Sequence, residues 1–196
     1  MKAKPLLLAG HSSRIIAAMI DESFLKDVFL FKTLTDSENH HVCSLLKEEK
    51  FKQGQTILEE GRPGDALYII WAGRVRVSRR FDKESFILTE LGPHDFFGEM
   101  SLIDDFPTSA TVDAIEDTTL FKMNREDFRS ITSQHNDLSS KLWESLARCM
   151  TIRIRKTGDL VKLYYGLSKA LCENEQFREL YTSWNFHAPK SGSLKS

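Results

Sequence analysis

The chain has 196 residues, a formal net charge of −1, and 41% hydrophobic and 10% aromatic residues. This length holds one domain of ordinary size with appendages, and the apolar content favours a packed core over a disordered chain. The small net charge excludes a general electrostatic attraction to nucleic acid or to anionic membranes.

The cysteines and the N-terminal residues indicate the compartment. Cys43, Cys149 and Cys172 are far apart and odd in number, so they predict no disulfide framework and fit a reducing environment. No apolar run reaches the roughly 18 residues of a membrane span, and the apolar part of MKAKPLLLAG is too short for a secretory signal. We expect a cytoplasmic protein without a membrane span.

The N-terminal part of the chain predicts two helices before the first strand. Residues 13–31 carry apolar side chains at helical spacing, which predicts an amphipathic helix ahead of the main domain. Asp36 or Ser37 is suited to cap a second helix. The spacing of the apolar residues then changes from helical to strand-like. Residues 56–58 form a short predicted strand that enters a turn at residues 61–65.

The middle of the chain predicts a series of short strands. Residues 67–71 are nearly all apolar, which is typical of a strand buried on both faces, whereas residues 74–79 alternate polar and apolar and predict one wet face. Residues 81–85 predict a hairpin tip. The remaining predicted strands are at residues 86–88, 111–115 and 118–123. About seven short strands in about seventy residues indicate a sandwich or roll.

The C-terminal part predicts further helices. Asn124 is a good N-cap, with Asp127 at the third helical position. A long helix is predicted from Asp137 to Arg155, and residues 157–159 are expected to end or bend it. A last helical stretch is predicted over about residues 160–182.

The long helix carries an apolar stripe whose partner the sequence leaves open. The stripe consists of Leu138, Leu142, Leu146, Cys149 and Met150. It can pair with a second copy or fold back on its own domain, and we expect a homodimer through residues 137–155. Residues 148–169 carry six basic side chains and one acidic side chain, which we interpret as a solvated helix face. Nucleic-acid binding through these basic helices is a less favoured hypothesis.

Residues 97–112, FGEMSLIDDFPTSATV, are the most informative segment. The segment resembles the phosphate-binding cassette of the cyclic nucleotide-binding domain family, which includes cAMP-dependent kinase regulatory subunits, nucleotide-gated channels and Crp/Fnr transcription factors. The matching positions are Gly98, Glu99, Pro107, Ala110 and Val112. The earlier segment FKQGQTILEEGRPGDALYIIWAGRVRV resembles the opening of the same family, and the resemblance covers roughly residues 30–156.

The resemblance implies an α+β fold. This fold is an antiparallel β-roll, similar to a double-stranded jelly roll, flanked by N-terminal helices and a long C-terminal helix. The domains expected are an N-terminal helical extension at residues 1–29, the roll at 30–136, C-terminal helices at 137–185 and a disordered tail at 186–196.

The resemblance also implies a ligand site. The candidate ligand-binding residues are Gly98, Glu99, Met100, Ser101, Thr108, Ser109 and Ala110. In the family the cassette helix directs its N-terminal amides at the cyclic phosphate. By this resemblance Gly98 lets the backbone approach the ligand, and Glu99 accepts a hydrogen bond from the ribose 2′-hydroxyl. Ser109 and Ala110 present a hydroxyl and an amide to the phosphate.

One cassette position departs from the family pattern. Thr108 stands where the family has the arginine that holds the phosphate. Loss of a desolvated charge partner costs about 2–5 kcal/mol, or roughly 30- to 4,000-fold in affinity. We therefore expect weak cAMP binding unless Arg79 or Arg80, on the strand before the cassette, supplies a replacement cation.

These features predict a non-enzymatic regulatory or sensor module with a degenerate phosphate site, which acts on a protein partner or a second copy. The alternative is a genuine receptor for a cyclic mono- or dinucleotide that uses a replacement cation. We predict no cofactor, no catalytic residues and no specific DNA binding, because the C-terminal remainder is too short for a winged helix-turn-helix. We also predict no metal site at His40, His41 and Cys43, or at Asp104 and Asp105.

Overall fold

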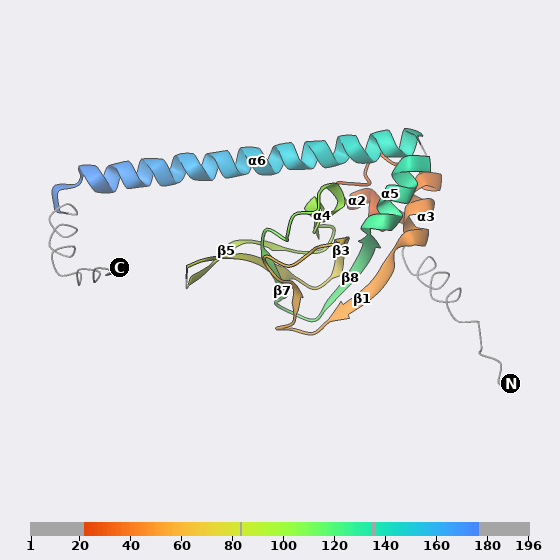
Figure 1. Ribbon diagram of the computed structural model, residues 1–196, viewed down its shortest axis with the longest axis horizontal. Helices are drawn as coiled ribbons and strands as arrows, with labels where there is room; N and C mark the ends of the chain where they lie inside the picture. The colour runs from red at the N-terminus through yellow and green to blue at the C-terminus, as the bar shows by residue number, and fades with distance from the viewer. Residues whose placement is uncertain (1–21, 83, 135, 177–196) are drawn as a thin grey trace, which may run out of the picture. The chain divides into compact units, whose positions relative to one another are not determined.

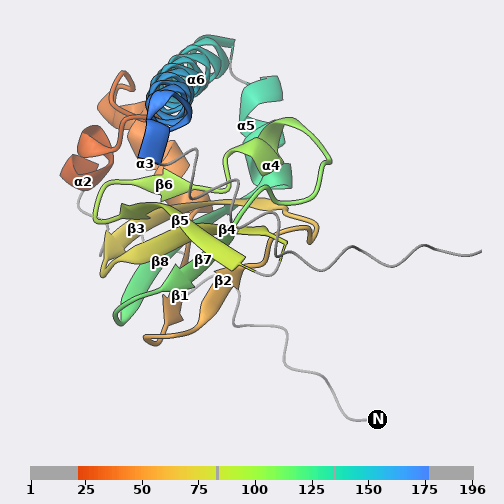
Figure 2. The same ribbon diagram turned by 90° about the vertical axis from the view of Figure 1, so that its left-hand side faces the viewer.

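The structure is a computed structural model that describes residues 22–82, 84–134 and 136–176. Its strands form two four-stranded antiparallel sheets (Figures 1 and 2). The first sheet has the order β1 (Lys47–Phe51), β8 (Thr118–Asn124), β3 (Ala66–Ala72) and β6 (Phe96–Phe97). The second sheet has the order β2 (Thr56–Leu58), β7 (Thr111–Ala114), β4 (Val75–Phe81) and β5 (Glu84–Leu91). The predicted α+β fold with an antiparallel β-roll is confirmed.

The two sheets share one hydrophobic core. Its buried members are Ala66, Tyr68, Ile70, Val75, Phe97, Val112 and Leu120, which come from both sheets. In β3 the first five residues are all buried, as predicted for a strand covered on both faces. The second sheet is more open, because every residue of β5 from Glu84 to Glu90 is exposed. Strand β5 is therefore the exposed edge of the roll.

Five helices accompany the roll in the described part of the chain. They are α2 (Glu22–Asp27), α3 (Asp36–Leu45), α4 (Met100–Ile103), α5 (Arg125–Gln134) and α6 (Asn136–Glu173). Figures 1 and 2 show α2, α3 and α5 on one side of the sheets. None of these helices is long and apolar enough to cross a membrane.

The first two helices differ from their predicted boundaries. The helix predicted to reach residue 31 ends at Asp27, and its predicted start lies outside the described residues. Residues 28–34 continue as turns in which an N–H group bonds the carbonyl three residues back. These turns bury Val28 and Phe31. The second helix is capped by Thr35 rather than Asp36, because Thr35 and Glu38 form a reciprocal capping box.

The chain divides into two compact units, one ending at Cys149 and one beginning at Met150. Helix α6 contributes to both. In the first unit Leu138, Leu142 and Leu146 are buried by the chain itself. Of the two alternatives that the sequence left open, the structure shows the stripe packed within its own unit, and a homodimer through residues 137–155 stays a prediction. Two polar contacts also join this part of α6 to α3 and to the turns before it, between Lys141 and Glu38 and between Ser145 and Thr33.

In the second unit α6 continues through Gly158 without a break. The prediction that residues 157–159 end or bend the helix is wrong. An isolated glycine costs a helix about 1 kcal/mol, which the strong helix formers farther out on either side, such as Lys156 and Leu160, offset. The large apolar side chains exposed here are Ile152, Ile154, Leu160, Val161, Leu163, Tyr164, Tyr165, Leu167 and Leu171. The expected domain boundaries stay predictions, and the tail at 186–196 lies outside the described residues.

Candidate functional site

The cassette begins at Gly98, which follows β6 directly. Gly98 has a φ of +80°, and a Cβ atom at this position would lie 2.5 Å from the carbonyl oxygen of Ala66. Only glycine fits this conformation and this close contact. The structure therefore gives Gly98 a packing role against β3.

Phe97, the residue before Gly98, belongs to an aromatic pair that a lysine side chain contacts. Phe97 stacks on Tyr68 with ring centroids 5.2 Å apart, and the Lys122 ammonium lies 5.6 Å from the Tyr68 ring centroid. Burial raises the pKa of the Tyr68 hydroxyl. Burial alone would lower the pKa of Lys122, but the nearby Tyr68, Glu49 and Asp65 outweigh it and raise that pKa. Lys122 stays charged and anchors the aromatic pair behind the cassette.

The cassette helix α4 is a single turn of four residues. Glu99 precedes it, is buried, and makes no side-chain capping bond to the helix. Ser101 is also buried, whereas Met100 is exposed. A helix of one turn has a small dipole, so its N-terminus attracts an anion weakly.

Thr108 is held by the loop that follows β2. Its hydroxyl lies 2.5 Å from the carbonyl oxygen of Glu59 and 3.1 Å from that of Arg62. Its backbone bonds the same loop, because the Thr108 N–H donates to Arg62 and its carbonyl accepts from Gly61. The Thr108 methyl group also packs 2.9 Å from where a Cβ of Gly64 would lie. A hydroxyl has one hydrogen, and here it is directed at backbone carbonyls, so it is not free for a phosphate.

At the end of the cassette, Ser109 and Ala110 have polar groups that make no close hydrogen bond within the described part of the chain. The Ser109 hydroxyl has a long contact of 3.7 Å to the sulfur of Met100. Ala110 is buried. No hydrogen bond within the described part of the chain uses the backbone N–H groups of Ser109 and Ala110. These two amides can therefore bind an acceptor group of a ligand.

The side chains of Arg62 and Arg79 near the cassette have carboxylate partners, whereas Arg80 bonds a carboxylate through its backbone. Arg79 Nε lies 3.2 Å from Glu60 Oε1, and the backbone N–H of Arg80 donates to Glu60 Oε2. Arg62 lies 3.2 Å from Glu59. A phosphate would therefore have to compete with a carboxylate for the charge of Arg62 or Arg79.

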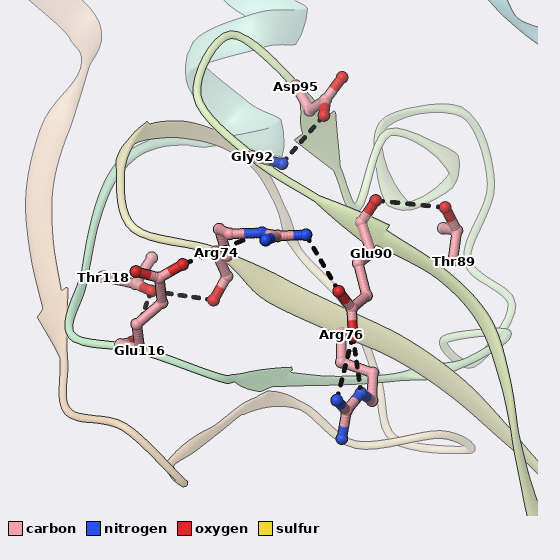
Figure 3. A network of polar contacts seen from close by, with 8 residues as sticks. All are labelled: Arg74, Arg76, Thr89, Glu90, Gly92, Asp95, Glu116 and Thr118. Atoms are coloured by element: carbon pink, nitrogen blue, oxygen red, sulfur yellow. Dashed lines mark hydrogen bonds and ion pairs between the residues drawn. The ribbon is translucent and has the colours of Figure 1, made fainter.

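A second group of arginines lies at the other end of β4. Figure 3 shows Arg74 and Arg76 on either side of Glu90, at 3.1 Å and 3.0 Å. Arg74 also lies 3.9 Å from Glu116, and its carbonyl accepts from the Thr118 hydroxyl. This network joins β4 and β5 to the turn before β8. It has a structural role at the β4–β5 side of the second sheet.

Comparison with known proteins identifies the domain. Residues 48–135 match the family model for the cyclic nucleotide-binding domain. The CRP-like cAMP-activated global transcriptional regulator of Mycobacterium tuberculosis is 36% identical over 131 residues, which are 66% of this chain and 57% of that regulator. Residues 48–135 of this chain therefore form a domain of the cyclic nucleotide-binding family. The chain spans less than two thirds of this relative's length.

Solved structures of similar proteins have the same fold. The catabolite activator protein of Thermus thermophilus is 31% identical with a TM-score of 0.64, over 70% of this chain and 63% of that one. The regulatory subunit of a cAMP-independent protein kinase A from Trypanosoma cruzi, solved bound to guanosine, is 25% identical with a TM-score of 0.61. This match covers 78% of this chain and 55% of that one.

Sequence reasoning missed one residue that organises the cyclic nucleotide-binding domain. Arg125, the first residue of α5, donates to the carbonyl oxygens of Ser101 and Gly64 and pairs with Asp105. Its side chain is largely buried. These bonds tie the cassette helix, the loop after β2 and α5 together. The only signal in the sequence was an arginine directly after the last strand, which has no distinctive spacing.

The weaker predictions concerned metals. Within residues 22–82, 84–134 and 136–176, no three His, Cys, Asp or Glu side chains are grouped as metal ligands. His40, His41 and Cys43 all lie on α3. Asp105 pairs with Arg125, and Asp104 accepts a hydrogen bond from the Phe106 N–H. Asp104 and Asp105 therefore have structural partners in the loop that follows α4 and in α5.

Proposed function

We propose that this domain is a non-enzymatic regulatory module with a degenerate phosphate site, which acts by binding a protein partner or a second copy of itself. The hydrogen bonds of Thr108 support this proposal most strongly. The residue that replaces the phosphate-binding arginine has no charge, and its one hydroxyl hydrogen is directed at the carbonyls of Glu59 and Arg62. A cyclic phosphate would thus gain no charged donor at this position.

The exposed part of α6 is the surface proposed for protein binding. Leu160, Tyr164, Leu167 and Leu171 follow one another at spacings of four, three and four residues, and all are exposed. This spacing is the a/d pattern of a two-stranded coiled coil. We therefore place the proposed homodimer contact in the second unit, C-terminal to the stripe that the sequence suggested.

Calorimetry with cyclic nucleotides tests the degenerate site. Wild-type protein is expected to bind cAMP and cGMP with dissociation constants weaker than about 100 µM, because the charged contact is missing. Thr108→Arg is expected to raise the affinity for at least one of them tenfold or more. Thr108→Val is the matched control, since it also removes the hydroxyl bonds but adds no cation.

The variant Glu99→Ala in the Thr108→Arg background tests the proposed ribose contact. The gain from Thr108→Arg is expected to disappear if Glu99 accepts the ribose hydroxyl. Micromolar binding of cAMP or cGMP by the wild type would contradict the degenerate site. A folded Thr108→Arg protein that gains nothing would show that the site is blocked, which leaves the docking function alone.

A second candidate function keeps ligand binding at the same site. It is favoured by the similarity to the Trypanosoma cruzi regulatory subunit solved with guanosine, a ligand that has a ribose and a base but no phosphate. In this chain the buried Glu99 and the amides of Ser109 and Ala110 can bind such a ligand without a cation. A cyclic mono- or dinucleotide would instead need Arg79 to leave Glu60.

We propose no sequence-specific DNA binding for this chain. The basic residues of α6 are partly neutralised in the helix, because Arg148 pairs with Glu144 at 2.7 Å and Lys169 lies 3.8 Å from Glu173. A gel-shift assay at physiological salt is expected to show only binding that competitor DNA removes. A footprint that survives competitor DNA would contradict this proposal.

A further inference from the structure

The exposed apolar surface of the second unit is wider than one contact between two helices needs. Helix α6 runs unbroken through these residues (Figure 1), so successive side chains are about 100° apart around its axis. Leu163 and Tyr165 are the borders of this surface, roughly 200° apart. The apolar side chains between them are exposed, and they are Leu160, Val161, Tyr164, Leu167 and Leu171. Over residues 160–171, Ser168 is the only polar residue among them. We call these seven apolar residues the apolar arc.

The proposed homodimer contact covers only the middle of the apolar arc. Its four residues, spaced as an a/d stripe, lie within roughly 60° of one another around the axis. In a two-stranded coiled coil Val161, Leu163 and Tyr165 would therefore stay in water beside the contact. The same spacing continued toward the N-terminus leads to Thr157 and Arg153, which do not extend an apolar contact. A contact this short makes a weak dimer, which a second partner can displace.

Basic side chains lie opposite the apolar arc and in the turns before it. Lys162 and Lys169 are seven residues apart, so they lie one above the other on the side opposite the arc. Arg153, Arg155 and Lys156 precede the arc, and residues 145–158 contain no acidic side chain. By their angles around the axis, Arg153 and Lys156 lie on the same side as the arc. They therefore face any surface that the arc contacts.

These features match the surface of an anionic lipid bilayer. An interfacial helix places a wide apolar side at the boundary of headgroups and acyl chains and keeps a basic polar side. Tyr164 and Tyr165 supply rings suited to this depth, because each ring is apolar and its hydroxyl is polar. Arginine and lysine beside the apolar side bind lipid phosphates. The net charge of −1 does not oppose this contact, because salt screens charges more than about 10 Å away.

We propose that residues 153–171 of α6 bind the surface of an anionic lipid bilayer, with the apolar arc at the headgroup boundary and Arg153 and Lys156 on lipid phosphates. This inference goes beyond the proposed function, because it gives the same segment a second partner. The homodimer contact lies inside the apolar arc, so one helix cannot use it for both partners at once. An anionic membrane therefore converts the homodimer into membrane-bound monomers.

Co-sedimentation of the full chain with lipid vesicles tests this inference. Vesicles of equal parts phosphatidylcholine and phosphatidylserine are expected to bind the protein at least about tenfold more tightly than vesicles of phosphatidylcholine alone. Raising the salt concentration is expected to reduce this difference, because salt screens the attraction between basic side chains and headgroups. The inference is overturned if the anionic vesicles sediment no protein or if both kinds of vesicle bind equally.

The double variant Val161→Gln/Tyr165→Gln separates the bilayer from the second copy. Both side chains belong to the apolar arc but lie outside the homodimer contact. The variant is expected to weaken vesicle binding at least about tenfold, and to change the dimer dissociation constant in ultracentrifugation by less than about threefold. Wild-type vesicle binding by this variant would overturn the inference. So would a lipid-free assembly larger than a dimer that the variant reduces to a dimer, because further copies would then cover the arc.

The double variant Arg153→Gln/Lys156→Gln tests the basic side chains. Loss of two charges is expected to weaken binding to anionic vesicles roughly thirtyfold. Lys47→Gln/Lys50→Gln is the matched control, since it removes two exposed positive charges from β1. The control is expected to leave vesicle binding unchanged, and thermal unfolding checks that all variants fold. If the two double variants behave alike, only net charge matters and the inference is overturned.

Energy transfer between donor-labelled and acceptor-labelled copies separates this inference from the proposed function. In solution the transfer reports the homodimer, and anionic vesicles are expected to abolish it, whereas phosphatidylcholine vesicles are expected to leave it unchanged. Transfer that persists on anionic vesicles would overturn the exchange of partners. A protein that shows no transfer in solution but binds anionic vesicles would contradict the homodimer and confirm the membrane contact. Transfer without any vesicle binding would overturn the inference and leave the proposed function standing.

Discussion

Leu146 and Leu163 lie in the same helix, α6, yet 1% of Leu146 is exposed against 67% of Leu163. Both halves of the helix carry leucines at helical spacing. In the first half they pack within the unit that contains the roll, and in the second half every described residue from Leu160 to Glu173 is exposed. The comparison shows that an apolar stripe indicates burial but does not name the surface that buries it. The apolar side chains of the second half stay exposed, and they form the surface that we propose for a partner.

The largest effect on stability is expected when the same charge is placed in each half of α6 and the two variants are compared. Leu146→Glu should lower the free energy of unfolding by more than about 4 kcal/mol, because it removes a packed side chain and buries a carboxylate. Leu163→Glu, the same change on an exposed face, should alter monomer stability by less than about 0.5 kcal/mol. Urea unfolding of both variants measures the difference. Equal stabilities would mean that the two halves are not distinct.

Charges in the second half of α6, which should hardly change monomer stability, should weaken self-association. The double variant Leu160→Glu/Leu167→Glu is expected to weaken dimerisation at least about a hundredfold, since it places like charges along the proposed contact. Lys162→Glu changes the net charge by the same two units on the other side of the helix and is expected to have a much smaller effect. Analytical ultracentrifugation over a range of concentrations measures both. A wild type that stays monomeric at the highest concentration would contradict the homodimer.

The ion pair between Glu38 and Lys141 should make the docking of the first half depend on pH. The Lys141 ammonium lies 2.7 Å from a Glu38 oxygen. Burial tends to raise the pKa of Glu38, but the hydrogen bonds from Lys141 and Thr35 outweigh it and lower that pKa below the ordinary 4.5. Lys141→Met should therefore lower stability by about 1–2 kcal/mol at neutral pH.

The pH dependence of this effect follows from the lowered pKa. A carboxylate with a lowered pKa stabilises the fold above its ordinary pKa of 4.5, and the stabilisation is lost as pH falls through the folded value. The difference between wild type and Lys141→Met should thus shrink in this acid range. Thermal unfolding at neutral pH and below pH 4.5 measures it. A difference that stays constant would show that packing, not charge, is responsible.

The smallest effect is expected at Asn39 on α3. Asn39 is fully buried, and neither its side-chain oxygen nor its nitrogen has a hydrogen-bond partner in the described part of the chain. Asn39→Leu has a similar shape and removes the unsatisfied polar atoms, so it should raise stability by about 1 kcal/mol. Asn39→Asp should lower stability, because it buries a charge. A loss of stability in Asn39→Leu would indicate that the amide has a partner.

The sequence predicted most of the roll because short-range rules determine it. The buried run at residues 67–71 and the alternation at 74–79 correspond to β3 and β4. Strands β1 and β6 were missed, since KEEKF in β1 is mostly charged and β6 has two residues. Their pairing comes from β8 and β3, which lie far away in sequence. A strand that depends on distant partners leaves a weak local signal.

The sequence by itself determined the family resemblance and the missing cation, because both depend only on which residue stands at which offset from Gly98. The tertiary structure decided what the substituted residue does. The Thr108 hydroxyl reaches the carbonyls of Glu59 and Arg62, more than 40 residues away in sequence. The register of β4 and β5 also places Arg79 opposite Phe86. Such contacts follow from how the strands pair and pack, and no local pattern of residues encodes them.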